Sequence, residues 1–232
     1  ELSVLSKLEG SDAITSELSG RFHTAPEPAG RADAIRFIVT TCGDFFQEKM
    51  PSIYPAVADL DPHFFVHTGD ILYYDYWAKN KALADYCWQR FFADPEQGQP
   101  YSQMSTYFMK DDHETLVNDA YPGMDATFMG DLTWEQGLEI YRYQVPMHEK
   151  TYRTVEWGKD LQVWFIEGRD YRSPNSMPDG PEKSMLGPVQ KQWLKDTIQA
   201  SDSTFRVVIT PNPIVGPDRA NKNDNLANEG FQ

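Results

Sequence analysis

One stretch limits the fold of this chain more than any other: residues 64–75, with the sequence FFVHTGDILYYD. Its apolar start predicts a buried strand, and its Gly-Asp marks the point where the strand gives way to a loop. Ligand-binding groups in open α/β sheets gather at the carboxyl ends of strands. The carboxylate of Asp70 therefore suits a metal ion, and Gly69 leaves room for close approach of backbone and ligand. The alternative is that Asp70 caps a turn, which is a common role of aspartate.

Other polar residues of this stretch are expected to have structural roles. His67 lies inside the predicted strand and is expected to be a satisfied core residue. Tyr74, Asp75 and Tyr76 are expected to serve packing and loop contacts.

The segments around this stretch predict an α/β fold with parallel strands. We expect strands at 34–41 and 64–68 with a helix at 51–59 between them. A strand, a helix and a strand within about 35 residues form a βαβ unit, whose strands are parallel. A helix at 77–92 and a third buried strand at 106–109 follow.

The second half of the chain continues the mixture of strands and helices after a long Gly/Pro/Asp-rich loop at 118–131. The expected elements are a helix at 132–143 capped by Thr133, a hairpin of strands at 151–156 and 161–166, a helix at 187–200 and a strand at 205–210. At the other end of the chain, residues 16–26 could form one short strand. Residues 27–30 (EPAG) predict a linker, with a domain boundary near Ala29.

The composition disfavours some classes of function. The 232 residues carry a net charge of −14 and a pI of about 4.7, which disfavours nucleic-acid binding through a basic surface. A phosphate substrate would need a local positive charge, for which bound metal cations are the obvious source. No apolar run approaches the ~18–20 residues that span a membrane. Two cysteines, Cys42 and Cys87, make no disulfide framework and leave the redox compartment open.

Polar groups follow three of the expected strands. They are Cys42 and Asp44, Asp70 and Tyr73, and Asp112 and His113. Because parallel strands end at one edge of their sheet, these groups should converge although they are far apart in sequence. Carboxylate, thiolate, phenolate and imidazole are all metal ligands, and the mixture suits iron or zinc. Asp70 has two oxygens and could bridge two metals about 3.5–4 Å apart.

A histidine and two arginines could act on a phosphoester. Imidazole donates a proton near neutral pH, so His113 could protonate a leaving oxygen, oriented by Asp111 or Glu114. The alternative for His113 is a capping role in a polar turn. Arg169 and Arg172 could hold phosphate oxygens, because guanidinium matches them bidentately, or they could form surface ion pairs.

With these motifs the sequence resembles the calcineurin-like metallophosphoesterases, most closely the PhoD-like alkaline phosphatase/phosphodiesterase family. The matching motifs are residues 42–44 (CGD), 69–73 (GDILY), 111–114 (DDHE) and 168–172 (GRDYR), and Leu186-Gly187 with Gln190, Trp193 and Leu194. The cysteine, the tyrosine and the DDHE are the PhoD-like variants of the wider pattern. The resemblance covers roughly residues 19–215.

The resemblance implies a metallophosphoesterase-type α/β fold in which β-sheet layers are flanked by helices, an incomplete four-layer αββα sandwich. A remnant of a small β domain would precede it. Residues 1–28 would then be the end of an N-terminal β-sandwich-like domain plus linker. Residues 29–232 would be the catalytic domain, truncated at its C-terminus.

The resemblance also implies a metal site with two ions, Fe³⁺ plus Ca²⁺, with Zn²⁺ or Mn²⁺ as alternatives. Asp70 would bridge them. Cys42 and Tyr73 would bind the first ion, and Asp112 the second, with Asn118 as a neighbour.

One family motif is expected beyond Pro211: a Gly-Asp-x-His strand end that completes the metal shells. The histidines are His23, His63, His67, His113 and His148, and none of them occupies that place. We therefore expect a piece of a longer protein, or a chain that ends early.

The first functional hypothesis is metal-dependent hydrolysis of small phosphate monoesters, diesters or both by a metal-bound hydroxide, with His113 as general acid. The resemblance implies a secreted or periplasmic protein, and the oligomeric state stays open. The alternative is a non-catalytic phosphate- or sugar-binding module on the same fold. Its pocket could be lined by Trp77, Tyr101 and Tyr107.

Overall fold

The computed structural model describes residues 1–32, 34–43, 52–215 and 224. Strands and helices alternate along most of this part of the chain, as expected for the α/β class. In chain order the elements are β1 (Leu2–Lys7), β2 (Ile14–Gly20), β3 (Phe37–Thr40), α1 (Tyr54–Asp59), β4 (Phe64–His67), η1 (Tyr74–Tyr76), α2 (Lys81–Ala93), η2 (Gln99–Gln103), β5 (Thr106–Phe108), η3 (Thr127–Met129), α3 (Trp134–Gln144), β6 (Arg153–Trp157), β7 (Leu161–Phe165), α4 (Gly187–Ala200) and β8 (Phe205–Ile209).

The first of two three-stranded sheets has the order β3-β4-β5, and both pairings are parallel. The apolar run at residues 64–67 forms the central strand, and all four of its residues are buried. The predicted parallel pairing of the first two strands is therefore confirmed. Because all three strands run the same way, their carboxyl ends meet at one edge of the sheet.

The second sheet has the order β6-β7-β8. β6 and β7 form the predicted antiparallel hairpin, whose turn places Gly158 at φ 64°. A positive φ costs glycine little, because it has no Cβ. Helix α4 then crosses over to β8, which pairs in parallel with β7.

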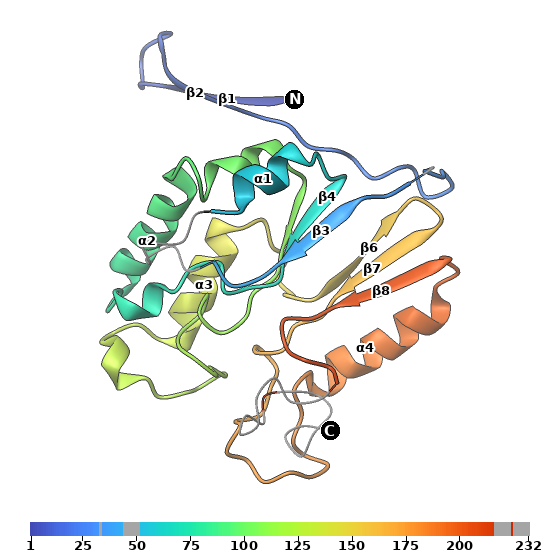
Figure 1. Ribbon diagram of the computed structural model, residues 1–232. Helices are drawn as coiled ribbons and strands as arrows, with labels where there is room; N and C mark the ends of the chain where they lie inside the picture. The colour runs from blue at the N-terminus through green and yellow to red at the C-terminus, as the bar shows by residue number, and fades with distance from the viewer. Residues whose placement is uncertain (33, 44–51, 216–223, 225–232) are drawn as a thin grey trace.

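Alternate residues of β4 belong to two different cores, as the two faces of a strand require. Phe64 and Val66 join Val163 and Phe165 of β7 in a cluster made by both sheets. Phe65 belongs to the cluster on the other face, with residues of α1, α2 and α3. Full burial of one such side chain stabilises the fold by about 1.5–3 kcal/mol. Figure 1 shows these three helices on one side of the molecule and α4 beside β8 on the other.

Helix α4 covers the outer face of the second sheet. Trp193 and Leu194 of the helix pack with Ile166 and Val208 in a third cluster. Trp164 of β7 also donates its indole N–H to the hydroxyl of Thr197, at 2.9 Å. The second sheet is thus fixed to the first sheet on one face and to a helix on the other.

The N-terminal segment differs from its prediction. The single strand expected at 16–26 is wrong, because residues 14–20 form β2 and pair antiparallel with β1, with Leu2 opposite Gly20. Nearly all of this hairpin is exposed. Its strands place polar residues on both faces, so they lack the clean apolar alternation that marks a half-buried strand.

The helix predicted at 77–92 begins later, at Lys81. Asn80 precedes it with extended backbone, and its side chain accepts the N–H of Leu83 at 3.0 Å. Asparagine at this position satisfies a backbone N–H that the first helical turn leaves free. Among the helices of the described residues, none has the length and apolar character that crossing a membrane requires.

His67 is a polar residue in the buried strand β4, and its role as a satisfied core residue is confirmed. Its Nδ1 accepts the N–H of Gly69 at 3.3 Å, so Nε2 carries the proton and donates to the Tyr54 hydroxyl at 2.9 Å. Complete burial lowers the pKa of His67 to about 3. The folded protein therefore holds this ring neutral.

We expect this histidine to make stability depend on pH. Below its ordinary pKa of 6.5 the unfolded chain binds a proton that the folded chain does not bind down to about pH 3. Between pH 6.5 and 5 the free energy of unfolding should fall by about 2 kcal/mol through this group. Urea unfolding of His67→Gln should lack this part of the fall, whereas the exposed His148→Gln should keep it. Identical pH dependence in the two variants would show that His67 is not the cause.

Candidate metal centre

Backbone hydrogen bonds join the loops that follow β3 and β4. Cys42 donates its N–H to the carbonyl of Gly69 at 3.1 Å, and Gly43 donates to the carbonyl of Asp70 at 2.7 Å. Cys42 and Asp70 both have left-handed backbone, with φ 57° and 55°. Such conformations cost about 1–3 kcal/mol for residues with a Cβ and persist only where the surroundings enforce them. The paired loops enforce them here, at the ends of two adjacent parallel strands.

Three of the predicted ligands meet at one carboxylate oxygen. The Tyr73 hydroxyl donates to Asp70 Oδ2 at 2.8 Å, and the Cys42 thiol donates to the same oxygen at 3.6 Å. Burial and the charge of Asp70 raise the pKa of Tyr73, and burial also raises the pKa of Cys42. Both groups are therefore protonated in the protein alone. A cation among them would favour the thiolate and the phenolate instead.

The other oxygen of Asp70 is the observation that most favours a cation. Asp70 Oδ1 is buried and has no hydrogen-bond partner within the described part of the chain. Burial and the charges of Glu114, Asp111 and Asp112 raise the pKa of Asp70 to about 8. A buried carboxylate that lacks a partner is costly, and a bound cation removes that cost. The residues present therefore fit a metal ion.

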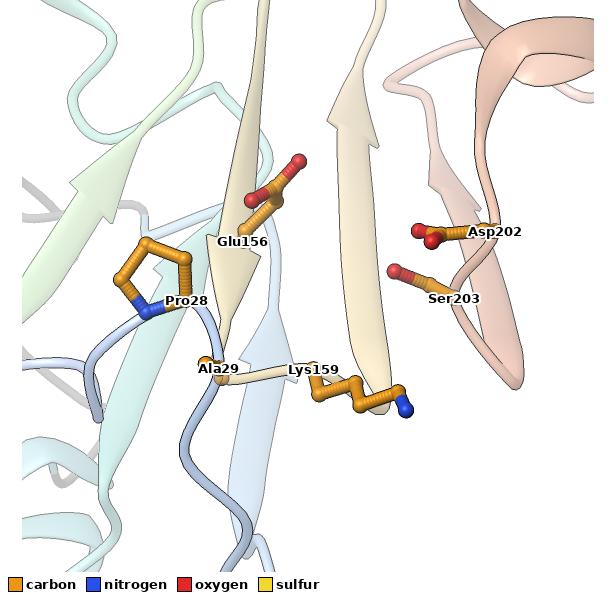
Figure 2. Close-up of a pocket in the computed structure, with 7 residues that line it drawn as sticks. Pro28, Ala29, Glu156, Lys159, Asp202 and Ser203 are labelled. Atoms are coloured by element: carbon orange, nitrogen blue, oxygen red, sulfur yellow. The ribbon is translucent and has the colours of Figure 1, made fainter.

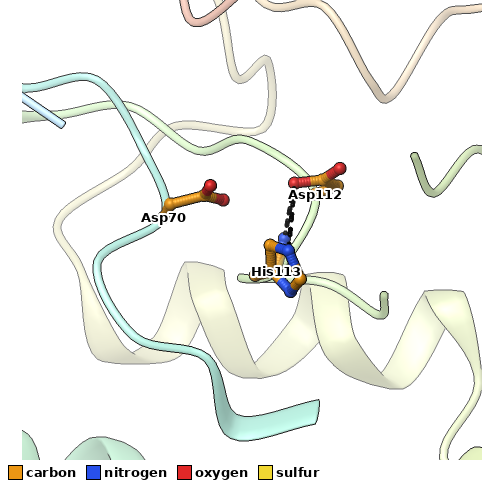
Figure 3. Close-up of side chains that lie close together, drawn as sticks. All are labelled: Asp70, Asp112 and His113. Carbon is orange, nitrogen blue, oxygen red and sulfur yellow. Dashed lines mark hydrogen bonds and ion pairs between the residues drawn. The ribbon is translucent and has the colours of Figure 1, made fainter. Parts of the chain in front are cut away.

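Asp112 and His113 complete this group (Figure 3). One ligand atom each of Asp70, Asp112 and His113 lies within 4.8 Å of the others. Asp112 Oδ2 accepts the backbone N–H of Asp119 at 2.5 Å and lies 3.2 Å from Arg169 Nη2. Burial opposes ionisation of Asp112, but the charges of Arg169 and His113 outweigh it and lower its pKa. Asp112 is thus an ionised carboxylate that faces Asp70.

His113 is held by a residue that the sequence did not indicate. Its Nδ1 lies 2.9 Å from Asp75 Oδ1, in the 3₁₀ turn η1. Burial alone would lower the pKa of His113, but the hydrogen bond to Asp75 and the charge of Asp112 raise it to about 9. The expectation that Asp111 or Glu114 orients His113 is wrong. Asp75 and His113 are 38 positions apart, so no local pattern links them.

Glu114 serves the backbone instead. Its carboxylate accepts the N–H groups of Ile71 and Asp111, the latter at 2.7 Å. These bonds tie the loop after β4 to the loop after β5 and fix Asp70 between them. Burial raises the pKa of Glu114 to about 7, although the backbone donors oppose the shift.

Both predicted arginines lie buried beside this group, which excludes the alternative of surface ion pairs. Arg169 donates from Nε to Asp111 and from Nη2 to Asp224, the latter at 2.9 Å. Arg172 Nη2 lies 2.6 Å from the other oxygen of Asp224. The structure therefore brings the arginines to the site but pairs them with carboxylates. Their role in binding substrate stays a prediction.

Two predicted positions are less well placed. Asn118 is exposed, and its neighbour Asp119 is the residue that bonds to Asp112. A role of Asn118 at the metal stays a prediction. Asp44 lies outside the described residues.

Clefts away from this edge have other linings. A cleft of about 460 Å³ lies at the hairpin turn, where Glu156, Lys159 and Asp202 approach Pro28 and Ser203 (Figure 2). This cleft lies at the amino-terminal ends of β7 and β8, which are the ends away from the candidate metal site. Tyr101 and Tyr107 line a cleft of about 360 Å³. Trp77, the third aromatic residue expected in a binding pocket, is not among the described residues that line this cleft.

Parallel strands that end in clustered carboxylates, a cysteine and a histidine form a candidate metal site on a fold of the α/β class. The model of the PhoD-like phosphatase family matches residues 37–229, and the chain belongs to that family. The sequence-based resemblance is thereby confirmed. Curated proteins give no match.

A solved structure described as "Structure of PhoD" has the same fold. Its TM-score with this chain is 0.71 at 17% sequence identity. The match covers 87% of this chain and 45% of that one, so the chain spans less than half the length of its structural relative.

Proposed function

We propose that this chain carries the site of a metal-dependent phosphoester hydrolase that acts on small monoesters, diesters or both. Membership of the PhoD-like phosphatase family supports phosphoester hydrolysis. The observation that carries metal dependence is the buried Asp70 Oδ1 beside Cys42 and Tyr73, which has no hydrogen-bond partner among the described residues. We also propose the four-layer αββα arrangement, a secreted or periplasmic location, and residues 1–28 as the end of a preceding β domain.

The proposed ligand set is the one that the family resemblance implies, and the contacts of Asp70 with Cys42 and Tyr73 and its approach to Asp112 support part of it. Asp70 would serve two ions, Cys42 and Tyr73 the first, and Asp112 the second, with Asn118 nearby. Fe³⁺ plus Ca²⁺ is the proposed pair, with Zn²⁺ or Mn²⁺ as alternatives. Bound ions would polarise a phosphoryl oxygen and supply an activated water at neutral pH.

His113 is the proposed general acid. Because Asp75 occupies Nδ1, the proton for a leaving oxygen would come from Nε2. Asp75 also favours the protonated ring, which is the form that a general acid needs. Arg169 and Arg172 would hold phosphate oxygens when substrate enters, which requires them to share contacts now made with carboxylates.

The substitution His113→Gln is expected to lower kcat for the hydrolysis of alkyl phosphates about a hundredfold, and kcat for p-nitrophenyl phosphate much less. An alkoxide is a poor leaving group and needs the proton, whereas p-nitrophenolate leaves without one. The measurement is kcat for both substrates with the same metal-loaded preparation. A loss of the same size for both would contradict the assignment of His113 as general acid.

The test of the function itself is metal analysis followed by hydrolysis of p-nitrophenyl phosphate and its bis ester. We expect bound metal and turnover that a chelator abolishes. No turnover with iron, calcium, zinc or manganese supplied would overturn the proposal. If calorimetry then showed phosphate binding, the non-catalytic binding module would replace it.

A further inference from the structure

A fully buried lysine, Lys110, lies just after β5. The Lys110 side chain has 0% exposure, and its Nζ lies 2.8 Å from Asp170 Oδ1 and 3.3 Å from Glu167 Oε1. Both acids follow β7, in the other sheet. The carboxyl ends of the two sheets are therefore linked by an ionic contact without access to water.

A second contact crosses the same junction with the charges reversed. Arg169 lies between Glu167 and Asp170 in sequence and pairs with Asp111 and Asp112, the residues that follow Lys110. The cation of each loop thus lies among carboxylates of the other loop. We call this arrangement of Lys110, Asp111, Asp112 and residues 167–170 the reciprocal clamp.

Glu167 connects the two halves of the clamp. Its Oε1 faces Lys110 and also accepts the N–H of Arg169 at 2.9 Å, and its Oε2 accepts the N–H of Asp170 at 2.6 Å. Gln190 of α4 holds the backbone of Glu167 with two hydrogen bonds of 2.8 Å. The charge of Lys110 thus acts on the carboxylate that shapes the turn carrying Arg169.

Stability alone is a weak reason for such a cluster. Burial opposes the charge of Lys110, although Asp170 and Glu167 outweigh it and raise its pKa. Well-packed apolar residues can often replace a buried ion pair without loss of stability. An ionic contact, unlike an apolar one, fixes the orientation of the groups that it joins. Here the contact between Lys110 and Glu167 fixes the orientation of the turn that carries Arg169.

We propose that Lys110 and Glu167 are positioning residues that hold the Arg169 guanidinium against Asp111 and Asp112. This inference rests on the proposed function for its effect on rate, because Arg169 is the group expected to meet phosphate oxygens. Within the described residues, the printed contacts of the Lys110 ammonium group are with Glu167, Asp170, the carbonyl of Asp111 and the ring of Trp134.

The variant is Lys110→Met, which keeps the length of the side chain and removes its charge. We expect kcat/KM for p-nitrophenyl phosphate to fall about tenfold, because a displaced Arg169 guanidinium would stabilise the transition state less well. The matched control is Lys81→Met, which breaks an ion pair of 2.8 Å with Glu139 on exposed helix surfaces and should leave the rate unchanged.

Combination with Arg169→Gln separates positioning from general damage. If Lys110 acts through Arg169, the double variant should be no slower than Arg169→Gln alone. Independent, multiplied losses would overturn the proposal, because they would show that Lys110 supports the site in another way.

A second measurement does not depend on turnover. Arg169 Nε–H donates to Asp111, and its proton exchange can be followed by ¹⁵N NMR. Lys110→Met should accelerate this exchange about tenfold or more, with Lys81→Met unchanged. Unchanged proton exchange of Arg169 in Lys110→Met would overturn the proposal that Lys110 positions Arg169. Faster exchange in a protein whose wild type lacks turnover would support the clamp and overturn the hydrolase proposal. If Lys110→Met does not fold, Glu167→Gln is used in the same measurements with the same criteria.

Discussion

Asp70→Asn is expected to lower kcat/KM about a thousandfold, equivalent to about 4 kcal/mol. Asp70 is the residue on which Cys42 and Tyr73 converge, and its second oxygen is buried without a partner in the described part of the chain. An amide keeps the shape of the side chain but loses the charge that would hold two ions. The measurements are metal stoichiometry by elemental analysis and steady-state kinetics.

Tyr73→Phe is the matched control, because Tyr73 would serve one ion and loses only a hydroxyl. We expect a smaller loss of metal affinity for this variant than for Asp70→Asn. Equal losses would contradict the bridging role of Asp70. When a chelator keeps the protein free of metal, Asp70→Asn should melt at a higher temperature than the wild type. The substitution removes a buried acid whose ionised form no cation then stabilises. This rise would separate loss of function from loss of folding.

Gly69→Ala is expected to lower the free energy of unfolding by about 3 kcal/mol or more. Gly69 has φ 117°, and a Cβ there would lie 2.3 Å from the backbone nitrogen of Asp111 and 2.7 Å from the carbonyl carbon of Lys110. The contact is with backbone, so no rotation of a side chain relieves it. The loops after β4 and β5 would have to separate, which moves Asp70 away from Asp112.

Gly123→Ala is the control for backbone conformation alone. Gly123 has φ +77°, and a Cβ there meets nothing within 4 Å. We expect a cost of about 1 kcal/mol from the positive φ. Urea unfolding of both variants gives the comparison, and a cost for Gly69→Ala no larger than that for Gly123→Ala would show that the close approach is not tight.

The sequence predicted the strands and their ends well, for a physical reason. A short apolar run such as residues 64–67 has to be buried, and a helix between two such runs favours parallel pairing. Parallel pairing in turn brings Cys42, Asp70 and Asp112 to one edge. These steps need only local pattern and connectivity.

The partners of the polar side chains could not be predicted in this way. Asp75 rather than Asp111 or Glu114 holds His113, because the turn at η1 carries it back over the loop after β5. Lys110 gave no signal, because a lysine beside acidic residues usually indicates a solvated surface. The hairpin of β1 and β2 was missed since its exposed strands lack a clean alternation of apolar and polar residues.

Residues 111–114 send four consecutive side chains to four different destinations. Asp111 pairs with Arg169, Asp112 faces Asp70, His113 bonds to Asp75, and Glu114 binds backbone N–H groups. Removal or insertion of one residue here would shift every assignment at once, whereas a single substitution alters only one. Engineering of the site should therefore hold the spacing of this segment fixed while its side chains are varied one at a time.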